Sequence, residues 1–427
     1  MTALNVLVFP CGSEIGLEIH SALKYSKAVR LFGASSVDDH GAYVYARYTQ
    51  IDAHVRSPDF IETLNALIDS WQIDVVLPAH DSVVLALALA AERIAATVAV
   101  PDAETAKLCR NKNVTYRAFA EEDFVPATVE GLAAHYPIFA KPAVGQGSQG
   151  AERIDSQARH VQLLGAGTEY VFSEYLPGKE YTVDCISDGS GGLLHASPRV
   201  RARVKAGISV STKPVPLDEE MSSIAERIAK RLRLKGAWFF QLKRNGEGRY
   251  KLLEVAPRIA GSMGLSRNLG INYPLLTVLA YRNLPFSVQT QQYPIQLDRA
   301  LKNCYRVGLK YDTVYLDLDD TLIIDGQVNV MLVALLYQWL GRQVSVVLVT
   351  RHNRCPRATL EANKLSPAIF SRIVHIADGS PKSTVIDRPE SAIFIDDSFR
   401  ERMDVSRETG VPVFDVDAVE QLMDWRL

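Results

Sequence analysis

The first hundred residues alternate short apolar runs with segments of helical periodicity. The run at 5–10 predicts a buried strand, and a helical pattern follows it through residue 23. A helix, a strand and another helix are predicted in turn between 60 and 94. Because strands that alternate with helices form parallel sheets covered by helices, we expect residues 1–102 to fold as a small α/β domain.

The pattern changes over residues 103–302, where long apolar strands, glycine-rich turns and clustered charges predict an α+β domain. A helical stretch over 103–122 opens it. Near its end, a predicted hairpin with a turn after Arg244 places Gln241 close to Glu254. A connector follows, and residues 311–427 resume the alternating pattern, which predicts a second parallel-sheet domain of Rossmann type.

Composition agrees with a multidomain globular protein. The chain has 427 residues, 47% of them apolar and 22% charged, which corresponds to roughly three domains. The formal net charge of −2 argues against a partner that is nucleic acid or a membrane surface. Five scattered cysteines are typical of a reducing compartment, and the sequence shows neither an export signal nor a membrane-spanning run. We therefore expect a cytoplasmic protein.

The central domain carries the residue types that a nucleoside triphosphate requires. Lys112 lies in the opening helical stretch, and a predicted strand ends in Lys141 beside a loop with three glycines in six residues, Gly145, Gly147 and Gly150. Glycines let backbone N–H groups wrap a phosphate, lysines offset its charge, and a carboxylate such as Glu254 offers oxygen to Mg²⁺. The sequence contains no Walker loop, so a different phosphate cradle is predicted.

The order of these features resembles the ATP-grasp superfamily, specifically its carboxylate–amine ligases related to biotin carboxylase and carbamoyl-phosphate synthetase. The resemblance covers roughly residues 1 to 300 and is strongest in YPIFAKPAVGQGSQG, FSEYLPGKEYTVD and LLEVAPRIAGS. It implies a pre-ATP-grasp domain over 1–102 and an ATP-grasp domain over 103–302. Such enzymes activate a carboxylate with ATP, giving an acyl phosphate and ADP, before an amine or another nucleophile displaces phosphate.

The resemblance also implies roles for individual residues. Nucleotide contacts fall on Lys112, Lys141, Gly145, Gly147, Ser148, Gly150, the adenine hinge Glu174, Tyr175 and Leu176, and the ribose contact Glu180. Arg258 would hold the transferred phosphate or the acyl phosphate, and Arg201, Arg203 or Lys205 would face an anionic substrate.

Two positions depart from the family pattern at the metal site. Glu254 is implied as the main ligand of Mg²⁺ (or Mn²⁺), but Gln241 stands where the family usually has an acid, and Ala256 where it has an asparagine. A glutamine offers only a neutral carbonyl oxygen and an alanine offers nothing. One metal position is therefore expected to be weakened or completed by another residue.

The C-terminal domain places acids after predicted strands. Asp317 ends the apolar run at 314–316, Asp319 follows two residues later, and Asp396 and Asp397 end another strand. Carboxylates just past parallel strands converge at one edge of the sheet. Thr350 ends a third strand, and Lys382 belongs to a predicted helix start, so a hydroxyl and a cation are expected beside the acids.

This set resembles the haloacid dehalogenase-like phosphatase superfamily, with its four motifs in order over residues 313 to 427. The resemblance implies that Asp317 attacks phosphorus, Asp319 acts as general acid/base, and Thr350 and Lys382 hold phosphoryl oxygens. Mg²⁺ would be bound by Asp317, Asp396, Asp397 and the Asp319 carbonyl. The interval 322–343 is too short for a large cap domain, which favours an open site. His352 and Arg354 lie at its predicted rim, where they either contact substrate or, the favoured interpretation, belong to a surface loop.

Two functions remain open at this level. The first is a bifunctional enzyme that joins an ATP-dependent carboxylate–amine ligase to a Mg²⁺-dependent phosphatase, with small carboxylates, amines and a phosphorylated metabolite as partners. The second is a phosphatase whose ATP-grasp domain binds nucleotide as a sensor. A docking role for the C-terminal domain is disfavoured by its intact motifs, and the oligomeric state is open, with a homodimer compatible with the resemblance.

Overall fold

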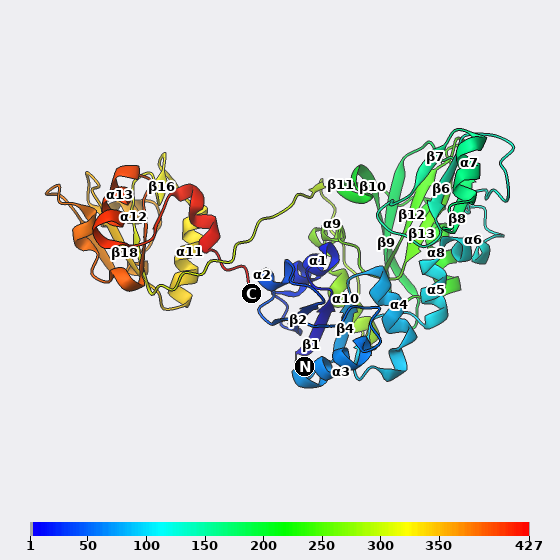
Figure 1. Cartoon of the computed structure of the whole chain (residues 1–427), viewed down its shortest axis with the longest axis horizontal. Helices are drawn as coiled ribbons and strands as arrows, with labels where there is room; N and C mark the ends of the chain where they lie inside the picture. Colours follow the sequence, from blue (N-terminus) through cyan, green and yellow to red (C-terminus); the bar gives the residue numbers. More distant parts are fainter. Residues whose placement is uncertain (1–2, 427) are drawn as a thin grey trace. The chain divides into compact units, whose positions relative to one another are not determined.

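A computed structural model describes residues 3–426 and divides them into two compact units, each of which is described by itself. The first extends to Lys302, and the second comprises Asn303–Trp425 (Figure 1). The first unit therefore includes both domains that the sequence predicts before the connector. Within the described residues, no helix is long and apolar enough to cross a membrane.

The N-terminal part of the first unit is a parallel sheet with helices on its faces (blue in Figure 1). Its strands, in spatial order, are β3 (Tyr48–Gln50), β2 (Val29–Ser35), β1 (Leu4–Phe9), β4 (Val75–Pro78) and β5 (Thr97–Val98). The helices are α1 (Glu14–Leu23), α2 (Gly41–Val44), α3 (Phe60–Trp71) and α4 (Asp81–Leu89). Phe60, Leu64 and Ile68 of α3 pack with Leu7 and Val76 in one apolar core, as the helical spacing of α3 predicts.

The helical stretch predicted at 103–122 is two helices. The first is α5 (Ala103–Arg110) and the second is α6 (Lys112–Ala118). Asn111 separates them because its backbone is extended (φ −113°, ψ 114°) and its side chain accepts hydrogen bonds from the first N–H groups of α6. Lys112 consequently stands at the first residue of α6.

Two antiparallel sheets form the central part of the first unit. The smaller has the order β7 (Glu152–Ile154), β6 (Ile138–Pro142), β8 (Tyr170–Glu174), with α7 (Gln157–Leu164) beside it. The larger has the order β13 (Tyr250–Ala256), β12 (Gly236–Arg244), β9 (Glu180–Ser187), β10 (Leu193–Lys205), β11 (Ile208–Pro214), β14 (Leu297–Asp298).

The larger sheet buries one face under a helix. Met221, Ile224 and Ile228 of α8 (Glu219–Leu232) pack with Trp238 and Phe240 of β12 in a continuous apolar core. Their i, i+3, i+7 spacing places them on one stripe of the helix. The shorter helices α9 (Gly264–Asn268) and α10 (Tyr273–Tyr281) follow β13.

The second unit is built on a parallel sheet with the order β19 (Arg372–His375), β18 (Ser345–Thr350), β15 (Thr313–Leu316), β20 (Ala392–Ile395), β21 (Val413–Phe414). Val314 and Leu316 face one apolar core, and Tyr315 faces the other, so both faces of the sheet are covered. The helices are α11 (Val330–Gly341), α12 (Pro356–Ala362) and α13 (Phe399–Thr409). The predicted helix start before Lys382 is a 3₁₀ turn, Lys382–Val385.

Candidate functional sites

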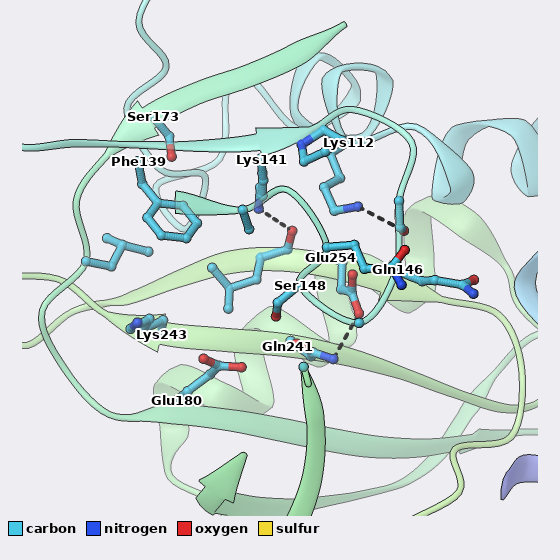
Figure 2. Close-up of a pocket in the computed structure, with 18 of the residues that line it drawn as sticks. Lys112, Phe139, Lys141, Gln146, Ser148, Ser173, Glu180, Gln241, Lys243 and Glu254 are labelled. Atoms are coloured by element: carbon cyan, nitrogen blue, oxygen red, sulfur yellow. Dashed lines mark hydrogen bonds between the residues drawn. The ribbon is translucent and has the colours of Figure 1, made fainter. Parts of the chain in front are cut away.

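Lys141 lies at the end of β6 with its ammonium group inside the first unit. Its Nζ donates to the Leu253 carbonyl at 2.9 Å (Figure 2). It also donates to the Tyr116 hydroxyl at 2.6 Å. Burial, followed by the nearby charge of Lys112, lowers the pKa of Lys141 to about 7. This lysine is therefore held in place but lacks a full counter-charge, as expected of a residue that receives an anion.

The glycine loop lies over the same hollow. The Gly145 carbonyl accepts from Lys112 Nζ at 3.4 Å and from Arg110 Nη1 at 3.0 Å. Gly147 (φ +60°) and Gly150 (φ +70°) adopt left-handed backbone, and so does Ser148 (φ +54°) between them. The loop is therefore shaped by backbone conformations that few other residues tolerate.

The tip of the glycine loop touches the turn between β10 and β11. A Cβ added to Gly207 would lie 2.0 Å from the carbonyl carbon of Gly147, so the two backbones meet with no side chain between them. The turn at Ala206 and Gly207 thus contacts the glycine loop directly through its backbone.

Glu254 and Gln241 face each other across β12 and β13, as the predicted hairpin required. They are direct register partners, and Gln241 Nε2 donates to Glu254 Oε1 at 2.9 Å. Both point into the hollow with Lys112 and Lys141 (Figure 2). Ala256 is buried opposite Phe239 two positions further on and presents no ligand. Glu254 thus offers the hollow a carboxylate for a metal, with the Gln241 amide beside it.

The predicted adenine hinge is only partly in the hollow. Glu174, Leu176 and Glu180 line it, whereas Tyr175 stacks against the guanidinium of Arg153, 4.8 Å from the ring centroid. Phe139 and Lys243 also line the hollow. Neither was predicted from the sequence, although Phe139 stands two residues before Lys141 on the same strand face, which was a usable signal.

Of the three basic residues predicted on β10, only Arg201 lines the hollow. Its Nη2 donates to the Gly207 carbonyl at 2.7 Å, and its Nε forms an ion pair with Glu180 at 2.9 Å. Arg203 pairs instead with Asp298 in solvent, and Lys205 is exposed at the end of the strand. A register shift between Arg201 and Arg203 breaks the simple alternation that the sequence implied.

Arg258 forms a bidentate ion pair with Asp81, the first residue of α4. Its Nε and Nη2 donate to the two carboxylate oxygens at 2.6 and 2.8 Å. Burial opposes ionisation of Asp81, but the Arg258 guanidinium outweighs it and lowers the pKa of that carboxyl. Asp81 was not predicted from the sequence, although it follows a parallel strand, where functional acids are common.

A second cavity of about 460 Å³ continues from the first and shares Lys112, Gln241, Glu254 and the glycine loop with it. Its far wall comes from the starts of α1 and α4 in the N-terminal domain, through Ser13, Glu14 and Asp81, and its floor from β9, β10 and β11. The first hollow thus opens into a wider, mainly cationic chamber.

In the second unit, Lys382 lies between two buried aspartates. Its Nζ is 2.8 Å from Asp317 and 2.6 Å from Asp396. Burial, opposed by Lys382 and reinforced by Asp396, raises the pKa of Asp317 to about 7. The two aspartates follow β15 and β20, adjacent parallel strands, which explains why residues so distant in sequence meet.

Asp397 and Thr350 complete this cluster in different ways. Asp317, Asp396 and Asp397 each present an oxygen within 4.8 Å of the others. Thr321 Oγ1 donates to Asp397 and accepts from its N–H, which fixes that loop. Thr350 is buried at the end of β18, the other neighbour of β15, and its hydroxyl accepts from the His352 N–H.

Asp319 is engaged by a histidine that the sequence analysis interpreted as a surface-loop residue. His352 Nδ1 lies 2.8 Å from Asp319 Oδ1, and its Nε2 lies 2.7 Å from Thr359 Oγ1. The His352 side chain is only 11% exposed, so the structure favours a positioning role over a free loop. Arg354 stays exposed, as predicted for the rim.

Comparison with known proteins supports the ATP-grasp resemblance of the first unit. Residues 168–302 match the family model described as "ATP-grasp in the biosynthetic pathway with Ter operon". The arginine-specific carbamoyl phosphate synthase large chain of Bacillus subtilis is 31% identical over 190 residues, which are 41% of this chain and 17% of that protein. The aligned part is therefore a small portion of the relative.

Two solved structures resemble the chain in fold. Biotin carboxylase from Campylobacter jejuni, in a β,γ-ATP complex, superposes with a TM-score of 0.54 at 16% identity, covering 67% of this chain and 73% of that one. L-amino acid ligase from Bacillus licheniformis gives 0.53 at 18% identity, covering 66% and 75%. The chain thus contains an ATP-grasp domain resembling carbamoyl phosphate synthase and biotin carboxylase, which confirms that part of the sequence-based resemblance.

Proposed function

We propose that residues 1–302 form an ATP-dependent ligase that joins a carboxylate to an amine and releases ADP. The observation that carries this proposal is the continuous hollow in which Lys112, Lys141, the glycine loop and Glu254 face one another beside a cationic chamber. The ATP-grasp fold and the similarity to an amino-acid ligase and a carbamoyl phosphate synthase support it.

In the proposed reaction, a carboxylate oxygen attacks the γ-phosphorus of ATP and the bond to the β-phosphate oxygen breaks, giving ADP and an acyl phosphate. The amine then attacks the acyl carbon, inorganic phosphate leaves, and the amine proton passes to solvent. Lys112 and Lys141 bind phosphate oxygens, and backbone N–H groups of the glycine loop cover them. Arg258, oriented by Asp81, faces the acyl phosphate.

The residues fit one Mg²⁺ better than two. Mg²⁺ is commonly bound by one or two carboxylates together with substrate phosphates, and Glu254 provides one carboxylate. Gln241 contributes at most an amide oxygen and Ala256 none. Bound Mg²⁺ would offset charge on the transferred phosphate, and Glu254 is the residue that would hold it.

Release of ADP tests this proposal. The full chain with MgATP should release ADP only when a carboxylate and an amine are both present, across a screen of amino acids and small acids. Lys141→Ala should weaken nucleotide binding. If no substrate pool produces ADP while nucleotide binding is intact, the ATP-grasp domain acts as a sensor and the ligase proposal is wrong.

We also infer a phosphatase site in the second unit, carried by the buried Asp317–Lys382–Asp396 cluster. Asp317 would attack phosphorus, expel the alcohol and form an aspartyl phosphate that water then cleaves. Asp319, oriented by His352, would give a proton to the leaving oxygen and take one from the water. Bound Mg²⁺ would offset repulsion between two anions, and the three clustered aspartates fit it.

The residues after Asp319 leave this site open. The hairpin of β16 (Ile323–Ile324) and β17 (Gln327–Val328) leads directly into α11, within the interval that is too short for a large cap domain. An open site should accept p-nitrophenyl phosphate as a substrate. Because the aspartate cluster is proposed to hold Mg²⁺, hydrolysis of this ester should require Mg²⁺ and stop when a chelator is added. Absence of hydrolysis with every phosphomonoester tried would contradict the inference.

A further inference from the structure

The floor of the cationic chamber holds buried polar atoms that lack partners. Among the described residues, Thr182 Oγ1, Arg199 Nη1 and Ser209 Oγ have no hydrogen-bond partner, and all three residues line this chamber. Their exposed fractions are 1%, 2% and 5%. Because buried polar groups are normally satisfied, a cluster of unsatisfied ones around one cavity indicates a ligand.

Arg199 is fixed in place by a buried acid. Its Nε and Nη2 donate to Asp184 at 2.8 and 3.1 Å, and neither side chain is more than 3% exposed. The planar guanidinium then has one nitrogen left, Nη1, whose two N–H groups are donors. Asp184 therefore positions Arg199 and leaves it ready to bind an acceptor.

The strand register separates these donors from the metal-binding end. Glu254 pairs with Gln241, Gln241 with Thr182, and Thr182 with Arg199, in one row across β13, β12, β9 and β10. Neighbouring strands lie 4.7–4.9 Å apart, so the Cα atoms of Glu254 and Arg199 are about 14 Å apart. This separation leaves room for two ligand groups, one beside Glu254 and one at Thr182 and Arg199.

The charge of the chamber favours an anion. Its lining includes six cationic side chains, from Arg110, Lys112, Arg199, Arg201, Arg258 and Arg299, against three acids, Glu14, Asp81 and Glu254. Two of those acids are paired with lining cations, Glu14 with Arg299 and Asp81 with Arg258, and two further cations, Arg199 and Arg201, are paired with Asp184 and Glu180. Arg110 and Lys112 therefore still outnumber the remaining acid of the lining, Glu254.

We propose that Thr182 and Arg199 bind a second carboxylate of the substrates, separate from the carboxylate that ATP activates. The Thr182 hydroxyl and the two N–H groups of Nη1 match the oxygens of one carboxylate. This subsite rests on the proposed ligase function and specifies its substrate class. The carboxylate belongs either to a diacid donor or to an amino-acid acceptor, and both sources present the same chemistry to these residues.

Thr182→Val tests the subsite with little risk to folding. The variant keeps the volume and removes a hydroxyl that has no partner in the protein, so the melting temperature should not fall. With MgADP bound, the affinity for the second-carboxylate substrate should drop roughly 10- to 100-fold, because a hydrogen bond to a charged group is lost. Affinity for MgADP itself should stay unchanged.

Thr212→Val is the matched control. Thr212 is also buried, but its Oγ1 donates to the Val200 carbonyl at 2.8 Å. This variant should lower the melting temperature and leave carboxylate binding intact, which is the opposite of the Thr182 result.

Two pairs of probes identify the source of the carboxylate, measured by calorimetry on the full chain with MgADP. A higher affinity for glutarate than for butyrate would indicate a diacid donor. A higher affinity for alanine than for alaninamide would indicate an amino-acid acceptor. The proposal holds if the wild-type chain prefers glutarate or alanine and Thr182→Val removes that preference. It is overturned if MgADP binds but neither preference exists, or if the variant retains it. Failure of MgADP to bind would instead refute the proposed nucleotide function.

Discussion

The molecule contains two parallel sheets with the same topology and different chemistry at the same place. In the first, β1 lies between β2 and β4; in the second, β15 lies between β18 and β20. In both, the chain reverses its winding direction beside the central strand, where α/β sheets commonly bind ligands. Asp396 is the first residue after β20, and Asp81 is the third residue after β4, the corresponding strand of the first sheet.

The difference lies in how those acids are compensated. Asp81 meets a single arginine, Arg258, in a bidentate pair that balances its charge. In the second sheet, Lys382 faces Asp317 and Asp396, with Asp397 close by, so negative charge exceeds positive charge. The first edge therefore orients a cation for a neighbouring cleft, whereas the second is suited to bind one. Shared topology sets the location of a site, and its side chains set its chemistry.

Asp317→Asn should have the largest effect, and it should distinguish the activity at one sheet edge from the activity at the other. Loss of the nucleophile should lower phosphomonoester hydrolysis at least about 1,000-fold, while carboxylate-dependent ADP release continues. Acid-trapped, phosphate-labelled protein should be found in the wild type and be missing in the variant. The exposed acid Asp417, changed to Asn, is the control. Residual labelling of the variant would place the nucleophile elsewhere.

Asp81→Asn tests the first edge. Without its acid partner Arg258 is both less ordered and left as an uncompensated, largely buried charge, so ADP release should fall about 10- to 100-fold. The free energy of unfolding should fall by roughly 2–3 kcal/mol, because breaking such a pair leaves one charge unpaired. Asp59→Asn, at an exposed acid that starts α3, should change neither. Unchanged turnover would show that Arg258 is not needed in that orientation.

The affinity for ATP should depend on pH through Lys141. Its pKa is about 7, so it is mostly protonated at pH 6 and mostly neutral at pH 8. Because phosphate oxygens favour the charged form, ATP affinity should fall as pH rises, by up to about 10-fold over that range. Lys141→Arg stays charged and should flatten the part of the pH dependence that is due to this residue, as fluorescence titration of both proteins would show. An identical pH profile in the two proteins would exclude Lys141 as its source.

Gln241→Glu should give the smallest change. Two facing carboxylates repel each other without metal, so the free variant should melt at a lower temperature than the wild type. MgADP should remove this difference in melting temperature. The variant should also need about 3- to 5-fold less Mg²⁺ than the wild type to bind MgADP. Gln241→Met, which removes the amide without adding charge, should lack this Mg²⁺ response.

Much of the architecture could be predicted because its determinants are local in sequence. Apolar strands ending in Asp317 and Asp396 predicted a parallel sheet with acids at one edge, and the hairpin predicted that Gln241 would face Glu254. The break at Asn111 was missed because its extended backbone is set by a capping bond, not by hydrophobic spacing.

Contacts between distant segments could not be predicted where strand order alone does not bring the residues together. Asp81 and Arg258 are 177 positions apart, and their pairing depends on how the N-terminal sheet packs against β13. His352 was assigned to a loop because its partners, Asp319 and Thr359, come together only in the folded unit. The unpartnered nitrogen of Arg199 likewise follows from the burial of Asp184 in the neighbouring strand.

The backbone contact between Gly147 and Gly207 links the two compartments of the first unit. The turn that holds Gly207 joins β10, which carries Arg199 and Arg201, to β11. The loop beside the nucleotide lysines and the hairpin that lines the substrate chamber therefore touch without any side chain between them. A shift of the loop when nucleotide arrives is thus expected to be transmitted to the strands that bind the acid.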